Sequence, residues 1–328
     1  MTITSSEPAT RPARRVTGPV LLWLFVLPGA LWALARLGGW ERGPLVQLFA
    51  FTPYVAAWTL LPAFVTLALR LWAPGAVALL AVVAMTAGVL PRAVPDADRG
   101  PVDGTALHVL TTNMLAGRAD PATIVGLVRD HDVAVLALQE FTPKAQAALA
   151  AAGLDALLPH SQLRAEPGTT GSAVYSRYPI TGGGIRRQGG GFLQAYGTIQ
   201  PPGGPAVLVE SAHPLAPFSL AALDDWRGDL QAEPRATADG PPRILLGDFN
   251  ATLDHRLLRQ LIASGYRDAA DAVGAGLIGT WGPYDGSPIP PVTIDHVLVD
   301  RRIGVREVSV HDMPRSDHRS VLAALTLP

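Results

Sequence analysis

Cysteine is absent from the 328 residues of this chain, and lysine occurs once, at Lys144, among 26 basic residues. Without cysteine the chain forms no disulfide, and this composition fits either side of a membrane. Charge is also scarce: 16% of the residues are charged and 48% are hydrophobic, whereas soluble domains typically carry about 25% charged residues. The shortage of charge therefore points to segments that do not face water.

The missing charges are concentrated near the N-terminus. Three uncharged stretches follow one another: 20 residues between Arg15 and Arg36, 27 between Arg42 and Arg70, and 21 between Arg70 and Arg92. A hydrocarbon core about 30 Å thick needs about 20 apolar residues in a helix. We therefore predict a three-helix transmembrane region over residues 16–90. The alternative, a signal peptide followed by buried core helices, fits less well, because a signal has an apolar region of only about 7–15 residues.

The orientation of these spans rests on the flanking arginines. Three of them precede the first span: Arg11, Arg14 and Arg15. This excess favours a cytoplasmic tail over residues 1–15, and three spans then place the rest of the chain outside the cytoplasm. The short loops between the spans support this orientation less clearly, because Arg36 and Arg42 would lie outside the cytoplasm and only Arg70 inside it. We expect a multi-pass protein of the cell membrane with an extracytoplasmic C-terminal domain.

Residues 91–104 are rich in proline, glycine and aspartate and show neither helical nor strand periodicity, which predicts a linker. Residues 105–328 are long enough for one sizeable domain. Its apolar patterns predict strands at 106–112, 133–138, 172–176, 194–199, 206–211, 243–246, 293–299 and 321–326, and helices at 121–130, 143–151, 219–231 and 255–264. This alternation predicts an α/β fold with sheets covered by helices.

Asp248 and Asn250 flank Phe249 at the end of one predicted strand. In an extended segment, residues two positions apart point to the same side. Both polar side chains would then face one site while Phe249 packs into the core. A carboxylate can hold a metal or a nucleophile, and an amide can orient a phosphate oxygen. The alternative is a surface turn, because this stretch also has good turn chemistry.

Asn113, Glu140 and His213 each follow a predicted strand. Mg²⁺ is usually bound by one or two carboxylates together with water and substrate phosphate, so an acid and an amide at strand ends suit a metal site. Taken singly, Asn113 and Glu140 are each more typical of a loop residue than of a ligand, and a histidine in the position of His213 is also compatible with simple exposure. Two imidazoles beside carboxylates, His213 and His318, can provide a general base and stabilise transition-state charge.

Asp295 lies within the apolar strand predicted at 293–299 and needs a partner, because an unpaired buried carboxylate is costly. His318, directly after Asp317, is the natural candidate, and an aspartate that orients an imidazole is familiar catalytic chemistry. The other histidines have no such neighbours and are interpreted as structural or surface residues: His108, His131, His160, His255, His296 and His311. His296 would point away from the face that carries Asp295.

The combined pattern resembles the endonuclease/exonuclease/phosphatase superfamily over roughly residues 105–328. The motifs that carry the resemblance are, in chain order, Asn113, Gln139-Glu140, Gly171–Ile180, His213, Gly247–Asn250, Thr280-Trp281, Ile294–His296 and Ser316–His318. The resemblance implies a four-layered α/β sandwich of the DNase I type, which cleaves phosphoesters with Mg²⁺ or Mn²⁺.

The same resemblance implies a role for each matching residue. Glu140 corresponds to the main metal ligand, helped by Asn113, and Asp317 adds a metal contact. Asp248 positions or deprotonates the attacking water, Asn250 and His213 contact the phosphate, and His318 is the catalytic histidine, oriented by Asp295. Members of the family differ in which group acts as the base, so that assignment stays open.

The substrate is approached through charge and architecture. From residue 100 onward the chain has 18 lysines and arginines against 23 aspartates and glutamates, a formal balance of −5, whereas nucleic-acid binders usually show a basic face. A membrane anchor raises the effective concentration of lipid-borne substrates. The architecture resembles a membrane-anchored bacterial subgroup that includes the VanJ-like proteins associated with glycopeptide (teicoplanin) resistance, which implies a lipid-linked phosphate or pyrophosphate of the cell envelope as substrate.

Two other classes of function are weighed against this one. A membrane-bound or extracellular nuclease would show salt-sensitive affinity for DNA. A membrane protein that kept the fold and lost activity is disfavoured, because none of the expected catalytic positions carries an apolar residue.

Overall fold

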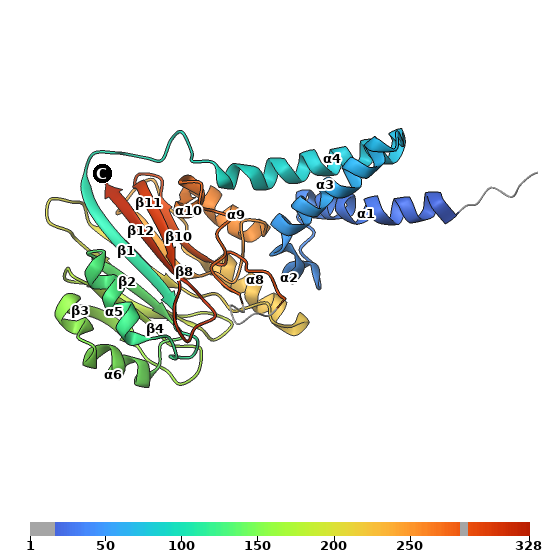
Figure 1. Ribbon diagram of the computed structural model, residues 1–328. Helices are drawn as coiled ribbons and strands as arrows, with labels where there is room; N and C mark the ends of the chain where they lie inside the picture. Colours follow the sequence, from blue (N-terminus) through green and yellow to red (C-terminus); the bar gives the residue numbers. More distant parts are fainter. Residues whose placement is uncertain (1–16, 283–287) are drawn as a thin grey trace, which may run out of the picture.

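The computed structural model describes residues 17–282 and 288–328, and two β-sheets packed face to face form its centre (Figure 1). The first sheet contains β1 (Thr105–Asn113), β2 (Val135–Gln139), β3 (His160–Arg164), β4 (Ser172–Ser176), β11 (Gly304–His311) and β12 (Ser320–Leu327). The second contains β5 (Thr181–Arg187), β6 (Leu193–Ile199), β7 (Val207–Ala212), β8 (Arg243–Asp248), β9 (Tyr266–Asp268) and β10 (Asp295–Asp300). Their strand orders are β11-β12-β1-β2-β4-β3 and β5-β6-β7-β8-β10-β9.

Helices cover the outer face of each sheet. The first sheet carries α5 (Pro121–Asp130), α6 (Pro143–Ala151) and α7 (Leu154–Leu157); the second carries η2 (Leu220–Ala222), α8 (Leu223–Ala232) and α9 (Arg256–Ala263). The short helix α10 (Ala269–Ala272) instead contributes to the core that the two sheets share. Val109 and Ile244 pack between the two sheets, Ile124 packs between the first sheet and its helices, and Trp226 of α8 packs between that helix and the second sheet. The result is the four-layered α/β sandwich that the sequence predicts.

Side-chain caps explain why two helices begin where the sequence predicts. The Asp120 carboxylate accepts a hydrogen bond from the Thr123 amide at 2.9 Å, and the Thr142 hydroxyl accepts one from the Ala145 amide at 3.2 Å. A proline follows each capping residue, where its missing N–H costs nothing. Both predicted helices, 121–130 and 143–151, are confirmed.

Four strands were absent from the sequence prediction: β3, β5, β9 and β11. All four lie at the edges of their sheets. An edge strand is buried less completely than a central one and needs no regular apolar alternation; β5, for example, begins Thr-Gly-Gly-Gly and is mostly exposed. The central strands carry the strong apolar pattern and were predicted within a few residues.

The N-terminal region contains α1 (Thr17–Gly38), α2 (Leu45–Phe49), α3 (Thr52–Ala68), α4 (Trp72–Val89) and η1 (Leu90–Ala93). Two stretches, Val20–Gly38 and Trp72–Ala93, are long and apolar enough to cross a membrane, and Thr52–Ala68 is shorter. This criterion uses length and composition only, and core helices and signal sequences also meet it. The three-span region therefore stays a prediction, and the tail at 1–15 lies outside the described residues.

The helical region lies at one side of the sandwich (Figure 1), and a buried ion cluster attaches it there. Arg36, in the last turn of α1, and Arg92, after α4, both bind the Asp254 carboxylate, at 2.5 Å and 2.7 Å. Val46 of α2 packs in the same apolar cluster as Trp226. The predicted linker at 91–104 also lies against the sandwich, through a bridge between Pro95 and Val273.

Candidate active site

Parallel strand pairs bring the predicted site residues together. β1 runs parallel to β2 and β7 parallel to β8, so the carboxyl ends of each pair meet at one edge of its sheet. The Asn113 amide donates to Asp248 Oδ2 at 3.0 Å and to Glu140 Oε1 at 3.3 Å. This residue therefore joins the two sheets at the point where their polar strand ends converge.

Two of the site residues have left-handed backbone conformations, Glu140 with φ of 56° and Asn250 with φ of 48°. Such conformations cost about 1–3 kcal/mol for residues other than glycine and concentrate at functional sites. A carboxylate hydrogen bond accompanies each turn. At the first, Glu140 Oε2 accepts from the Ala116 amide at 2.5 Å; at the second, Asp248 Oδ1 accepts from the Asn250 amide at 2.8 Å. The chain thus turns sharply and presents both side chains to one cavity.

The side chains of Asp248, Phe249 and Asn250 lie where the sequence predicts, with a turn at Asn250 that faces a cavity and not the open surface. Phe249 is fully buried and packs edge-to-face on His296, with ring centroids 5.8 Å apart, while Asp248 and Asn250 line the cavity. Gly247 has to be a glycine, because an added Cβ would lie 2.0 Å from the Ala212 carbonyl oxygen. Strand alternation alone does not explain this placement, because the left-handed turn at Asn250 directs the Asn250 side chain toward the cavity.

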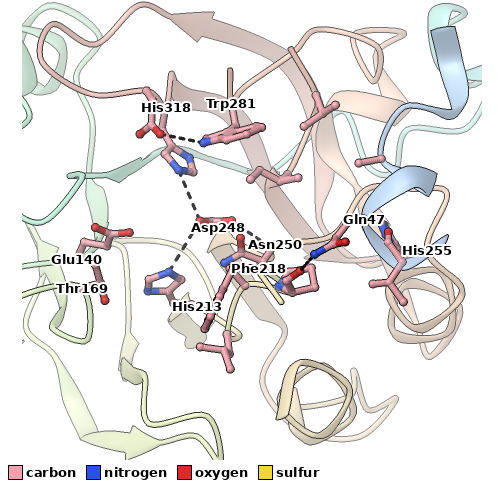
Figure 2. Close-up of a pocket in the computed structure, with 18 of the residues that line it drawn as sticks. Gln47, Glu140, Thr169, His213, Phe218, Asp248, Asn250, His255, Trp281 and His318 are labelled. Atoms are coloured by element: carbon pink, nitrogen blue, oxygen red, sulfur yellow. Dashed lines mark hydrogen bonds and ion pairs between the residues drawn. The ribbon is translucent and has the colours of Figure 1, made fainter. Parts of the chain in front are cut away.

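Asp295 binds His318, as predicted. The two Asp295 oxygens lie 3.1 Å and 2.9 Å from His318 Nδ1, and the Thr280 hydroxyl accepts from the Asp295 amide. The far nitrogen of His318 lies 3.8 Å from Asp248 Oδ2, as does His213 Nε2. Figure 2 shows Asp248 between these two imidazoles.

The two imidazoles carry different charges. Burial lowers the pKa of His213 to about 3, so this ring is neutral near pH 7. Burial also opposes the charge on His318, but the Asp295 and Asp248 carboxylates outweigh it and raise the pKa of His318 to about 10. Burial raises the pKa of Asp248 to about 7. The site therefore pairs a cationic imidazole with a carboxylate that can accept a proton.

The described residues offer two groups of donors for a metal ion. Asp317 Oδ1 is buried with no hydrogen-bond partner among the residues that the structure describes, while its Oδ2 accepts from the Trp281 indole at 3.0 Å. Burial raises the pKa of Glu140, and the nearby Asp317 charge adds to this effect. A second group, Asp248, Asp295 and His318, places its ligand atoms within 4.8 Å of one another.

Asn113 takes a different position from the one expected of a metal ligand. Its NH₂ group points at Glu140 and Asp248, and its side-chain oxygen accepts from the Leu115 amide at 2.9 Å. In this arrangement Asn113 orients the carboxylates, and one of the two acceptor positions of its side-chain oxygen is already occupied.

The site opens into a cavity of about 530 Å³. The catalytic candidates that line it are Glu140, His213, Asp248, Asn250, Asp317 and His318. Asp295 lies behind His318 and Asn113 behind the carboxylates, so neither lines the cavity. His296 points to the other face of β10, as predicted, and binds Asp268 at 2.6 Å.

His255 was interpreted as a residue without functional neighbours, yet it lines this cavity. Its Nε2 lies 2.7 Å from the Val46 carbonyl oxygen, and its Nδ1 accepts from the Thr252 amide at 2.8 Å. Gln47 and Phe218 line the same cavity and were also missed. Nothing local in the sequence signals these contacts, because Val46 and His255 are more than 200 positions apart.

Two facing six-stranded sheets, with carboxylates and imidazoles gathered at their strand ends, define a phosphoesterase sandwich of the DNase I-like class. The endonuclease/exonuclease/phosphatase family matches residues 110–318, well over half of the chain, and the protein belongs to this family. Members of the family are hydrolases that act on phosphate esters and generally use a divalent metal. No curated protein matches the chain.

Solved structures agree with this assignment at the level of the fold. An endonuclease/exonuclease/phosphatase from Beutenbergia cavernae is 21% identical, over 68% of this chain and 72% of that one, with a TM-score of 0.51. TDP2 of D. rerio, complexed with a single-stranded DNA product, is 14% identical over 68% and 99% of the chains, with a TM-score of 0.53. A mannosyl-6-phosphatase of Bacteroides thetaiotaomicron is 16% identical over 67% and 100%, with a TM-score of 0.50.

Proposed function

We propose that the protein is a divalent-metal-dependent phosphoesterase, anchored in the cell membrane, that acts outside the cytoplasm on a lipid-borne phosphate or pyrophosphate. The observation that carries the chemistry is the buried Oδ1 of Asp317, which lies in the same cavity as Glu140 and has no hydrogen-bond partner in residues 17–282 and 288–328. A buried carboxylate oxygen needs compensation. Mg²⁺ or Mn²⁺, which prefer oxygen ligands, would provide it.

Each side chain has a role in this proposal. Glu140 and Asp317 hold the cation, which when bound polarises the phosphate oxygens, and Asn113 orients Glu140. Asp248 positions the attacking water and accepts its proton. The cationic His318 ring, oriented by Asp295, stabilises the negative charge that develops on the phosphate.

His213 and Asn250 complete the phosphate site. His213 is neutral and packs against Phe192, with ring centroids 4.5 Å apart, so it can donate one hydrogen bond without adding charge. The Asn250 NH₂ group donates to the Pro214 carbonyl oxygen at 3.0 Å and keeps its second hydrogen for a phosphate oxygen.

The helices support the membrane anchor by their length and surface. At a rise of about 1.5 Å per residue, the 22 residues of α1 extend about 33 Å and the 17 of α3 about 26 Å, close to a hydrocarbon core of about 30 Å. Large apolar side chains such as Leu24, Phe64 and Leu80 are more than 60% exposed. Only 33% of the apolar stretch in Val20–Gly38 and 28% of the one in Trp72–Ala93 is buried, whereas a core helix is mostly buried.

The path of the chain supports the proposed orientation. α1 runs toward the sandwich, α3 runs away from it, and α4 returns (Figure 1). The exposed Arg70 lies in the distal turn between α3 and α4. Three spans would therefore separate the N-terminus from the sandwich, and the arginines of the 1–15 tail favour the cytoplasm for that end.

A nuclease is the second candidate, because the D. rerio structure of the same fold holds a single-stranded DNA product. The formal balance of −5 from residue 100 onward disfavours a polyanionic substrate. A direct comparison of substrates decides between the two functions.

The test uses the full-length protein in detergent, with p-nitrophenyl phosphate, bis(p-nitrophenyl) phosphate, DNA, phospholipid and an isoprenoid pyrophosphate. We expect hydrolysis of a phospholipid or isoprenoid ester that EDTA abolishes and Mg²⁺ restores. Asp248→Asn and His318→Ala should lower kcat by about 10²–10⁴-fold, and His160→Ala on edge strand β3 is the matched control. Full activity in metal-free buffer would refute the metal site, and preferential cleavage of DNA would replace the lipid substrate.

A further inference from the structure

One wall of the catalytic cavity comes from outside the sandwich. Val46, Gln47, Ala50 and Phe51 line the cavity together with the catalytic carboxylates. All four belong to the segment between α1 and α3, whereas the family match begins at residue 110. Figure 2 shows Gln47 beside Phe218 and across the cavity from Glu140.

This wall is firmly fixed to the sandwich. Gln47 Nε2 donates to the Pro217 carbonyl oxygen at 2.6 Å, and the Val46 carbonyl oxygen binds His255 Nε2 at 2.7 Å. The Glu41 carboxylate accepts from the Arg256 amide. Val46 itself is fully buried in the apolar cluster beneath α8 and α9. The segment therefore forms a permanent part of the cavity.

The cavity is lined by both polar and apolar residues. Glu140, Asp248, Asp317 and the imidazoles supply catalytic polar groups, and Gln47 lies across the cavity from Glu140 (Figure 2). The apolar residues that line the cavity include Ala50, Phe51, Leu215 and Phe218. Phe218 is 72% exposed and lies at the rim, where a large aromatic side chain gains nothing from contact with water.

We infer that Ala50, Phe51 and Phe218 bind the apolar chain of a phosphate ester that remains in the membrane while its phosphate reaches the carboxylates. The inference rests on the proposed function and names the residues that select the substrate. The wall leads directly into α1 and α3, whose outer faces are apolar. An amphiphilic ester can thus enter without exposing its chain to water.

The test is a series of alkyl phosphate esters from methyl to octyl, used below their micelle concentrations with the full-length protein. Each methylene buried against such a wall improves binding by about fourfold, so kcat/KM should rise with chain length and then level off. Phe218→Ser and Ala50→Asp should reduce the octyl-to-methyl ratio to about threefold or less. Leu220→Ser is the matched control, because Leu220 is 62% exposed at the start of η2, two residues after Phe218, and does not line the cavity.

Two results would overturn the inference: a wild-type series with no dependence on chain length, or an unchanged octyl-to-methyl ratio in Phe218→Ser. If the methyl ester is then still cleaved in an EDTA-sensitive reaction, the proposed function stands without this substrate preference. If no ester is cleaved, the proposed function fails. The inference about the apolar wall is then tested separately, by the binding of alkylphosphonates. In that case octylphosphonate should raise the Tm of wild-type protein more than methylphosphonate does, and Phe218→Ser should remove the difference.

Discussion

Replacing Asp254 with alanine should destabilise the whole protein, because this carboxylate joins the helical region to the sandwich. Its Oδ1 accepts from Arg36 Nε at 2.5 Å and from Arg92 Nη2 at 2.7 Å, and its Oδ2 accepts from Arg92 Nη1 at 2.8 Å. The three side chains are at most 10% exposed. Alanine would leave two guanidinium groups buried without their anion.

The expected loss follows from the burial of the partners. Removing one member of a buried ion pair costs about 3–5 kcal/mol, out of a total stability of about 5–15 kcal/mol. The matched control is Asp224→Ala, which breaks the ion pair between Asp224 and Arg227. The Asp224 side chain is 95% exposed. An exposed pair of that kind contributes about 0–1 kcal/mol.

The assay is urea unfolding of both variants in the same detergent, monitored by tryptophan fluorescence. The urea midpoints are compared with one shared m value, the slope of unfolding free energy against urea concentration. The pH dependence gives a second readout. Burial alone would raise the pKa of Asp254, but Arg92 and Arg36 outweigh it and hold that pKa below its ordinary value. A lowered folded-state pKa stabilises the protein above the unfolded value, about 3.9, and this contribution disappears as the pH falls further.

Wild-type protein should therefore lose this part of its stability below about pH 4, the unfolded aspartate value, and Asp254→Asn should not show that loss. If Asp254→Ala moves the midpoint no further than Asp224→Ala does, the ion cluster does not hold the two regions together.

Three further predictions follow from the site and the helices. Mg²⁺ should raise the Tm of wild-type protein but not of Glu140→Gln, with a stabilisation of about 2.7 kcal/mol at a metal concentration 100 times Kd; an equal shift in both would place the ion elsewhere. Asp295→Asn should lower kcat by about 10²–10⁴-fold with little change in KM, measured by steady-state kinetics, because it misorients His318; a change confined to KM would contradict that role. Alkaline phosphatase fused after Pro328 should be active, and activity of a cytoplasmic reporter at the same point would reverse the proposed topology.

Central elements of the fold could be predicted because burial leaves a pattern in the sequence. The strand Val135–Gln139 is buried along its whole length and reads as one apolar run. An edge strand such as Gly304–His311 is half exposed and includes Arg306 and Glu307, so its residues resemble a loop. Such a segment becomes a strand because it pairs with one neighbouring strand, and that pairing depends on residues elsewhere in the chain.

The same difference separates the site residues that were found from those that were missed. Asp248 and Glu140 directly follow apolar runs, so their position at a strand end is visible locally. His255 contacts Val46 only because α2 packs on the sandwich, and the sequence around either residue contains no trace of that contact. The direction of the Asn113 amide is likewise set by two carboxylates, Glu140 and Asp248, that come from different sheets.

Strand alternation, the reason given for the placement of Asn250, does not extend to that residue. Extended geometry would continue β8, but Asn250 adopts a left-handed conformation that the hydrogen bond from its backbone amide to the Asp248 carboxylate maintains. Glu140 departs from β2 in the same way, held by the Ala116 amide. Conformations that cost free energy persist where surrounding contacts enforce them, and sites of function are where such departures are expected. If these turns exist to aim the two carboxylates, Asn250→Gly should retain the fold and the Asp248 geometry while losing its phosphate contact and its hydrogen bond to the Pro214 carbonyl oxygen, whereas Glu140→Gly should lose Mg²⁺ stabilisation altogether. Thermal shifts with and without Mg²⁺ separate the two outcomes, and equal metal responses in both variants would contradict the distinction.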